Sequence, residues 1–271
     1  MNSSEGTVSG PVIQGANAAP RAGRPLTWGA FVAVVVLGLA LGLACVALGA
    51  VAYRLLLGLE ASGALPRHSL RDSLAAAGIG WQPFVLAASS GLFYLSFLLA
   101  IWLVVRRFLR AGWDLVGWRP APWTAFAAVI PVYVLTLLVS AVTLSVEARL
   151  FFHGRLDNPQ QAIFSGVTRN SAAQFLLYWL VIAVLTPVVE ETLFRGFLFQ
   201  LLRRSLPLWA AVGGSALVFA LAHGLPTLAP SLFIFGVALA LVFHYTRSLY
   251  CSIFLHMLIN SLAVFAGLAS R

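Results

Sequence analysis

Apolar residues in this chain form long, nearly unbroken runs that are separated by short polar segments. The runs cover about 26–53, 84–105, 123–146, a stretch from 172, a short segment to about 204, 208–222, 228–245 and 249–268. A helix of about 20 apolar residues crosses a bilayer, and helices satisfy their own backbone hydrogen bonds in lipid. The pattern predicts an all-α fold, a polytopic transmembrane bundle of about eight helices.

Three regions follow from this pattern. Residues 1–25 are rich in Ser, Gly, Ala and Pro and have no apolar period, so we expect a disordered N-terminal tail. Residues 26–171 are predicted to form N-terminal transmembrane helices and loops. The first apolar run of this region, about 26–53, is too long for the apolar core of a signal peptide and is predicted to be the first span. Residues 172–271 contain the polar motifs and are predicted to be the catalytic region.

Composition supports a membrane protein and excludes two other classes. The chain is 61% hydrophobic and 9% charged, against about 25% charged residues in soluble domains. Its net charge of +9 comes only from arginine, without a basic stripe interleaved with aromatics, so we expect no nucleic-acid partner. Exclusive use of arginine indicates a GC-rich genome. The expected location is therefore a bacterial cell membrane, with the lipid bilayer as a partner.

Loop arginines predict the orientation. The short loop after the second run contains Arg106, Arg107, Arg110 and Arg119. Short cytoplasmic loops carry an excess of basic residues, so this loop and the N-terminus are expected on the cytoplasmic side. The following apolar run from 172 would then deliver its polar end near the cytoplasmic face.

Glu190 and Glu191 stand side by side within apolar sequence. An ionisable residue at membrane depth is costly and indicates a functional site. On a helix, Glu191 and Arg195 share a face and can pair, whereas Glu190 is rotated by about 100°. An orientation-setting ion pair would explain Glu191 alone, so Glu190 is the candidate reactive carboxylate. Pro187, one turn earlier, is expected to kink this helix.

Two further motifs place polar side chains in apolar segments. His223 ends the run 208–222, and His256 and Asn260 lie four positions apart inside the last run. Each is open to a simpler interpretation, a packing histidine or a hydrogen bond between helices. A carboxylate, two histidines and an amide are together the groups needed to activate a water and stabilise an oxyanion.

Other polar and sulfur residues fit no such pattern. His68, His153 and His244 are expected at the surface, and Cys45 and Cys251 as apolar fillers. Two rival functions stay open. One is a rhomboid-like serine protease using Ser215 with His256. The other is a non-catalytic membrane immunity or scaffold protein that retains the polar cluster for packing.

The motifs Glu190-Glu191-x-x-x-Arg195, Phe219-x-x-x-His223 and His256-x-x-x-Asn260 occur intact and in order. The chain resembles the CPBP group, the second type of CAAX prenyl endopeptidases and related bacteriocin-processing or abortive-infection proteins. This resemblance covers about 172–268 and implies an intramembrane endopeptidase. It implies that Glu190 activates the water with His223, that His256 and Asn260 stabilise the oxyanion, and that Glu191 and Arg195 shape the site.

The same resemblance leaves the cofactor open between two accounts. We favour a glutamate mechanism without a cofactor, because no His-Glu-x-x-His motif preforms two metal ligands. The alternative is zinc held by Glu190, His223 and His256. The expected substrate is a peptide or membrane protein, either CAAX-like or bacterial.

Overall fold

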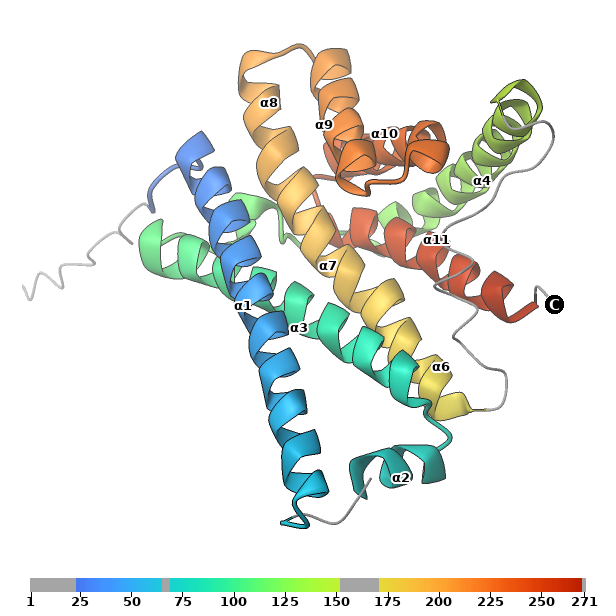
Figure 1. The fold of residues 1–271 in the computed structure, drawn as a ribbon. Coiled ribbons are helices and arrows are strands. Elements are labelled where there is room, and N and C mark those ends of the chain that lie inside the picture. Colours follow the sequence, from blue (N-terminus) through green and yellow to red (C-terminus); the bar gives the residue numbers. More distant parts are fainter. Residues whose placement is uncertain (1–22, 65–68, 152–170, 270–271) are drawn as a thin grey trace, which may run out of the picture.

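The computed structural model describes residues 23–64, 69–151 and 171–269, which form a bundle of helices without a strand in these ranges (Figure 1). This confirms the predicted all-α bundle. The predicted tail lies almost wholly outside the described residues, as do His68 and His153. The α-helices are α1 (Trp28–Ala61), α2 (Ser69–Ala76), α3 (Trp81–Trp102), α4 (Trp123–Phe151), α6 (Ala172–Trp179), α7 (Thr186–Glu191), α8 (Gln200–Ser205), α9 (Leu208–Ala222), α10 (Ala229–Thr246) and α11 (Leu249–Ala269).

Helices long and apolar enough to cross a membrane account for most of the fold. Six such spans lie among the described residues: 28–61, 81–108, 123–150, 172–205, 226–246 and 249–266. The protein is therefore an integral membrane protein. Helix α9, predicted as a span, is about 22 Å long and shorter than a bilayer core. Helix α2 lies in a segment that was predicted to be a loop.

The run from 172 and the short segment to about 204, predicted as separate helices, are not separate. Residues 172–205 form one continuous helix that passes between α3 and α11 and places the two glutamates near its middle (Figure 1). Two wider π-helical segments, η3 (Leu180–Leu185) and η4 (Thr192–Phe199), alternate with α6, α7 and α8. Sequence periodicity does not distinguish a π segment from an ordinary helical turn. The apolar pattern therefore predicted two helices where the structure has one.

The widened segment η3 accommodates Pro187 inside the helix. Proline lacks an N–H group, and its ring clashes with the carbonyl four residues earlier in a regular α-helix. Here the Thr186 N–H bonds to the carbonyl of Val181, five residues back, and the Thr186 hydroxyl donates to the same carbonyl over 3.0 Å. The expected local disturbance at Pro187 thus takes the form of a π segment.

Small residues set the close approach of the helices around this central one. A side chain at Gly38 or Gly42 of α1 would meet the rings of Phe97 or Phe93 of α3 at 2.5 and 2.6 Å. Gly236 of α10 lies equally close to the backbone of Ala216 in α9, 2.9 Å from the position of an added Cβ. These contacts bring α1 against α3 and α9 against α10, and α3 and α10 each also contact the helix 172–205.

The remaining short elements connect the helices. They are the π-helical η1 (Leu103–Phe108), which extends α3, and the 3₁₀ turns η2 (Trp113–Val116) and η5 (Pro226–Leu228). The loop after η2 is tied to the start of α11, because the Leu249 N–H donates to the Gly117 carbonyl over 2.8 Å. This connection holds α11, and with it His256 and Asn260, against the rest of the bundle.

Candidate active site

One cavity of about 370 Å³ brings the sequence-predicted groups together. It lies between α3, the helix 172–205, the α9–α10 connection, α10 and α11, and much of its wall is apolar. Glu190, His223, His256 and Asn260 all line it, although they come from segments up to seventy positions apart. Its wall also includes the side chains of Tyr94 and Thr186, which the sequence did not single out.

Glu191 and Arg195 lie behind this cavity in the protein core. Both side chains have no solvent exposure, and the Arg195 Nη1 group donates to Glu191 Oε1 over 2.9 Å. The predicted ion pair is therefore present. Arg195 Nη2 also donates to the Gly236 carbonyl over 3.0 Å, and the Phe219 ring packs 4.5 Å from the guanidinium carbon. The pair ties the central helix to α9 and α10.

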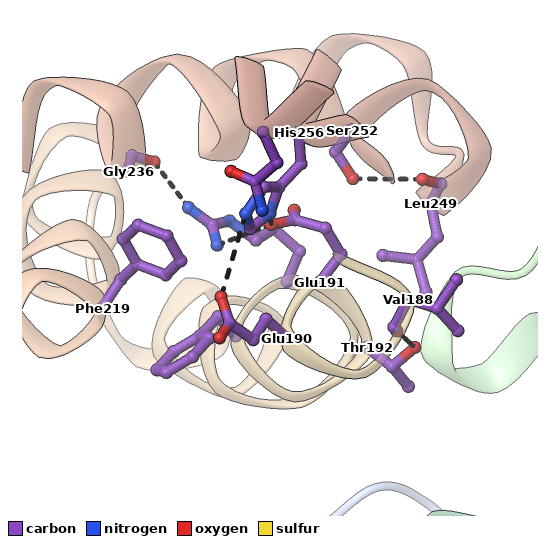
Figure 2. A network of polar contacts seen from close by, with 12 residues as sticks. Val188, Glu190, Glu191, Thr192, Phe219, Gly236, Leu249, Ser252 and His256 are labelled. Atoms are coloured by element: carbon purple, nitrogen blue, oxygen red, sulfur yellow. Dashed lines mark hydrogen bonds and ion pairs between the residues drawn. The ribbon is translucent and has the colours of Figure 1, made fainter. Parts of the chain in front are cut away.

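His256 lies between the two glutamates (Figure 2). Its Nδ1 atom is 3.0 Å from Glu191 Oε1, and its Nε2 atom is 3.9 Å from Glu190 Oε2. Because an ionised carboxylate only accepts hydrogen bonds, Nδ1 carries the proton toward Glu191. The Nε2 atom therefore faces Glu190, as a lone pair in the neutral ring or as a second donor in the imidazolium.

His223 is oriented by the end of its own helix. Its Nδ1 atom lies 2.8 Å from the Phe219 carbonyl, which can only accept, so Nδ1 is the donor. In the neutral ring the Nε2 lone pair is then directed toward Glu190 Oε2, at 3.8 Å. His223 is 21% exposed, more than His256 at 2%, and forms the open side of the polar cluster.

Glu190 has a partner that the sequence analysis missed. The Tyr94 hydroxyl of α3 donates to Glu190 Oε1 over 3.0 Å. The sequence indicated a partner for Glu191 alone, but one oxygen of Glu190 is also held by a hydrogen bond. The other, Oε2, is buried and has no hydrogen-bond partner among the described residues, and it is the oxygen that faces both histidines.

Asn260 connects α11 to the central helix. Its Nδ2 group donates to the Ile182 carbonyl over 2.9 Å. In the π register the N–H group that would bond to this carbonyl belongs to residue 187, which is proline. The Asn260 amide takes the place of that missing donor, and its second Nδ2 hydrogen remains for the cavity.

The three residues of the zinc alternative, Glu190, His223 and His256, face one another in the cavity. In the part of the chain that the structure describes, no group of three His, Cys, Asp or Glu side chains is arranged to hold a metal ion. The His256 Nδ1 atom is engaged by Glu191, and Nε2 of each histidine lies nearly 4 Å from Glu190 Oε2. Atoms at these separations leave room between them for one water molecule or one metal ion.

The serine alternative is not supported by the structure. Ser215 is fully buried and does not line the cavity. Its hydroxyl donates a hydrogen bond to the Phe194 carbonyl over 3.4 Å. His244, which was predicted at the surface, is half-buried beside the Phe199 ring. Cys45 and Cys251 are free thiols.

Comparison with known proteins agrees with the resemblance. Residues 172–262, about a third of the chain, match the family model of the type II CAAX prenyl endopeptidase Rce1-like proteins. Over this segment the chain is similar to that family of proteases. No curated protein and no solved structure matches the chain. The match begins with the helix of Glu190 and Glu191 and ends just after Asn260.

Proposed function

We propose that this protein is an intramembrane endopeptidase in which the Glu190 carboxylate activates a water molecule. The observation that carries the proposal is the buried, unpartnered Glu190 Oε2, 3.8 Å from His223 Nε2 in a cavity between apolar helices. A water between these two acceptors can donate one hydrogen to each. That geometry directs the lone pairs of its oxygen away from both groups and toward a peptide carbonyl.

The proposed reaction is hydrolysis in two steps. The water oxygen bonds to the carbonyl carbon while Glu190 takes its proton, and the carbonyl oxygen becomes an oxyanion. The C–N bond then breaks, and Glu190 passes the proton to the leaving nitrogen. Proton transfer by a positioned carboxylate contributes about 10²–10⁴-fold to such reactions.

Asn260 and His256 are the proposed oxyanion donors. Asn260 has a second Nδ2 hydrogen free for the cavity, since the first is bound to the Ile182 carbonyl. His256 donates from Nε2 when its ring takes up a second proton during the reaction, because Nδ1 already donates to Glu191. Preorganised donors of this kind are worth about 10²–10³-fold each.

The proposed substrate is a peptide or membrane protein, and the proposed mechanism uses no cofactor. The matched family is described by its action on CAAX prenyl proteins, which favours a substrate with a CAAX-like end. The arginine-only usage favours a bacterial peptide instead. The apolar cavity wall, which includes Leu232 and Ile259, suits an extended segment with apolar side chains.

The test is a comparison of membrane peptides from cells that produce wild-type protein or the Glu190→Gln variant. Glutamine keeps the shape of the side chain but cannot take a proton. We expect peptides ending at one class of cleavage site to be present with wild type and absent with Glu190→Gln, at equal protein levels. Identical peptides in both strains would contradict a peptidase and favour the scaffold function.

A further inference from the structure

We propose that Tyr94 is a positioning residue for the reaction, which orients the Glu190 carboxylate toward the water. The inference rests on the proposed function. It starts from the hydrogen bond of 3.0 Å between the Tyr94 hydroxyl and Glu190 Oε1, which joins α3 to α7 across the cavity. Among the described residues, the Tyr94 hydroxyl is the hydrogen-bond donor to the Glu190 side chain.

The two oxygens of Glu190 have different surroundings. Oε1 accepts from Tyr94, whereas Oε2 is buried without a hydrogen bond and faces Nε2 of His223 and His256. Fixing one oxygen of a planar carboxylate restricts rotation about its terminal bond. The Tyr94 hydroxyl therefore determines which oxygen is presented to the water, and in which direction.

The neighbouring acid shows why a phenol suits this task. Glu191 is held by the Arg195 guanidinium, whose positive charge compensates its negative charge. A guanidinium on Glu190 would stabilise the ionised carboxylate and weaken it as a base. The hydroxyl of Tyr94 carries no charge, so it orients Glu190 and leaves its negative charge available for the proton of the water.

Tyr94 is itself held in place from two directions. Its hydroxyl also interacts with the Thr186 side chain, which belongs to the same helix as Glu190. Its ring packs edge-on against Phe93 at 5.9 Å, and Phe93 packs onto α1 at Gly42. A hydroxyl on a side chain fixed in this way reaches Glu190 at little cost in conformational freedom.

The test compares Tyr94→Phe with wild type on a fluorogenic peptide that spans a cleavage site found in the peptide comparison. Phenylalanine keeps the ring and removes only the hydroxyl. We expect kcat to fall about 10–100-fold, the cost of a misplaced catalytic group, while KM changes less than about twofold. Tyr133→Phe, which removes a hydroxyl from α4 outside the cavity, is the matched control and is expected to keep wild-type kcat.

Two outcomes separate this inference from the proposed function. If Glu190→Gln is inactive and Tyr94→Phe has wild-type kcat, Tyr94 has no positioning role and the proposed function stands. If Glu190→Gln cleaves as fast as wild type, the proposed function itself fails. A raised KM with unchanged kcat in Tyr94→Phe would assign the hydroxyl to substrate binding and overturn the inference.

An infrared measurement tests the hydrogen bond without a substrate. The Glu190 band is obtained as the difference between the spectra of wild type and Glu190→Gln. The same difference taken in the Tyr94→Phe background should show this band shifted, because the carboxyl group has lost its donor. An unchanged band would mean that Tyr94 does not hold Glu190, and this result would also overturn the inference.

Discussion

At the scale of single residues, two adjacent acids have opposite environments. Glu191 has no solvent exposure and shares its Oε1 atom between Arg195 and His256. Glu190 is 12% exposed, lines the cavity and is held by one neutral hydroxyl. The rotation of about 100° between consecutive helical residues produces this division. One carboxylate becomes part of the core, and the other remains available for chemistry.

The first prediction concerns the buried ion pair. Arg195→Met removes the charge that compensates Glu191, and we expect the free energy of unfolding to fall by about 3–5 kcal/mol. The double variant Glu191→Gln, Arg195→Met should be less destabilised than Arg195→Met alone, because no unpaired charge stays buried. Reversible unfolding in mixed detergent micelles measures both. Additive losses would show that the two side chains do not depend on each other.

Sequence reasoning at this scale succeeded where the interaction is local. The spacing of Glu191 and Arg195 predicted their pair because both lie on one helical face. Tyr94 was missed because it lies ninety-six positions before Glu190, and a tyrosine in an apolar span reads as a packing residue. No local pattern reports a contact between helices so far apart in sequence. The catalytic roles of the cavity residues stay predictions.

At the scale of helices, the central feature is the unbroken helix 172–205 with its π segments. The apolar pattern predicted most of the helices, but it placed Glu190 and Glu191 near the end of a span. Proline was read as a kink, whereas the helix widens and continues. The freed Ile182 carbonyl is bonded by Asn260 of α11, which no local rule predicts. The consequence is that α11 is held against the helix of Glu190 at the cavity.

A double variant tests this link between α11 and the central helix. We expect Asn260→Leu to lower the free energy of unfolding by about 1–2 kcal/mol, since it leaves the Ile182 carbonyl without a donor. Pro187→Ala supplies an N–H group at that register, so the loss caused by Asn260→Leu should shrink in this background. The readout is the same micelle unfolding. An equal loss in both backgrounds would contradict the claim that the Asn260 amide replaces the N–H group that Pro187 lacks.

At the scale of the whole molecule, charge is distributed unequally between the two ends of the bundle. One end carries Arg24, Arg106, Arg107, Arg110, Arg119, Arg203, Arg204 and Arg247, with Asp114. Among the described residues at the other end, Arg54, Arg71 and Arg149 are matched in number by Glu60, Asp72 and Glu147. The described residues at the first end are also joined, since Arg204 donates to the Leu26 carbonyl.

This asymmetry predicts that the arginine-rich end faces the cytoplasm. A protease-cleavable tag before Met1 should be protected in intact cells and cut in inside-out vesicles, because Arg24 at the start of α1 lies at the same end. A tag between α8 and α9 should behave in the same way. Cleavage of either tag in intact cells would reverse the predicted orientation.

The central claim is that Glu190, and not the mere presence of an acid in the bundle, activates the water. The most direct measurement is the single-turnover cleavage rate of the fluorogenic peptide by purified protein in proteoliposomes. We predict that Glu190→Gln loses at least about 100-fold in rate, since the general base is removed. Glu147→Gln, the same change in α4 outside the cavity, should cleave at the wild-type rate with an unchanged unfolding midpoint. Cleavage by folded Glu190→Gln at the wild-type rate would contradict the account.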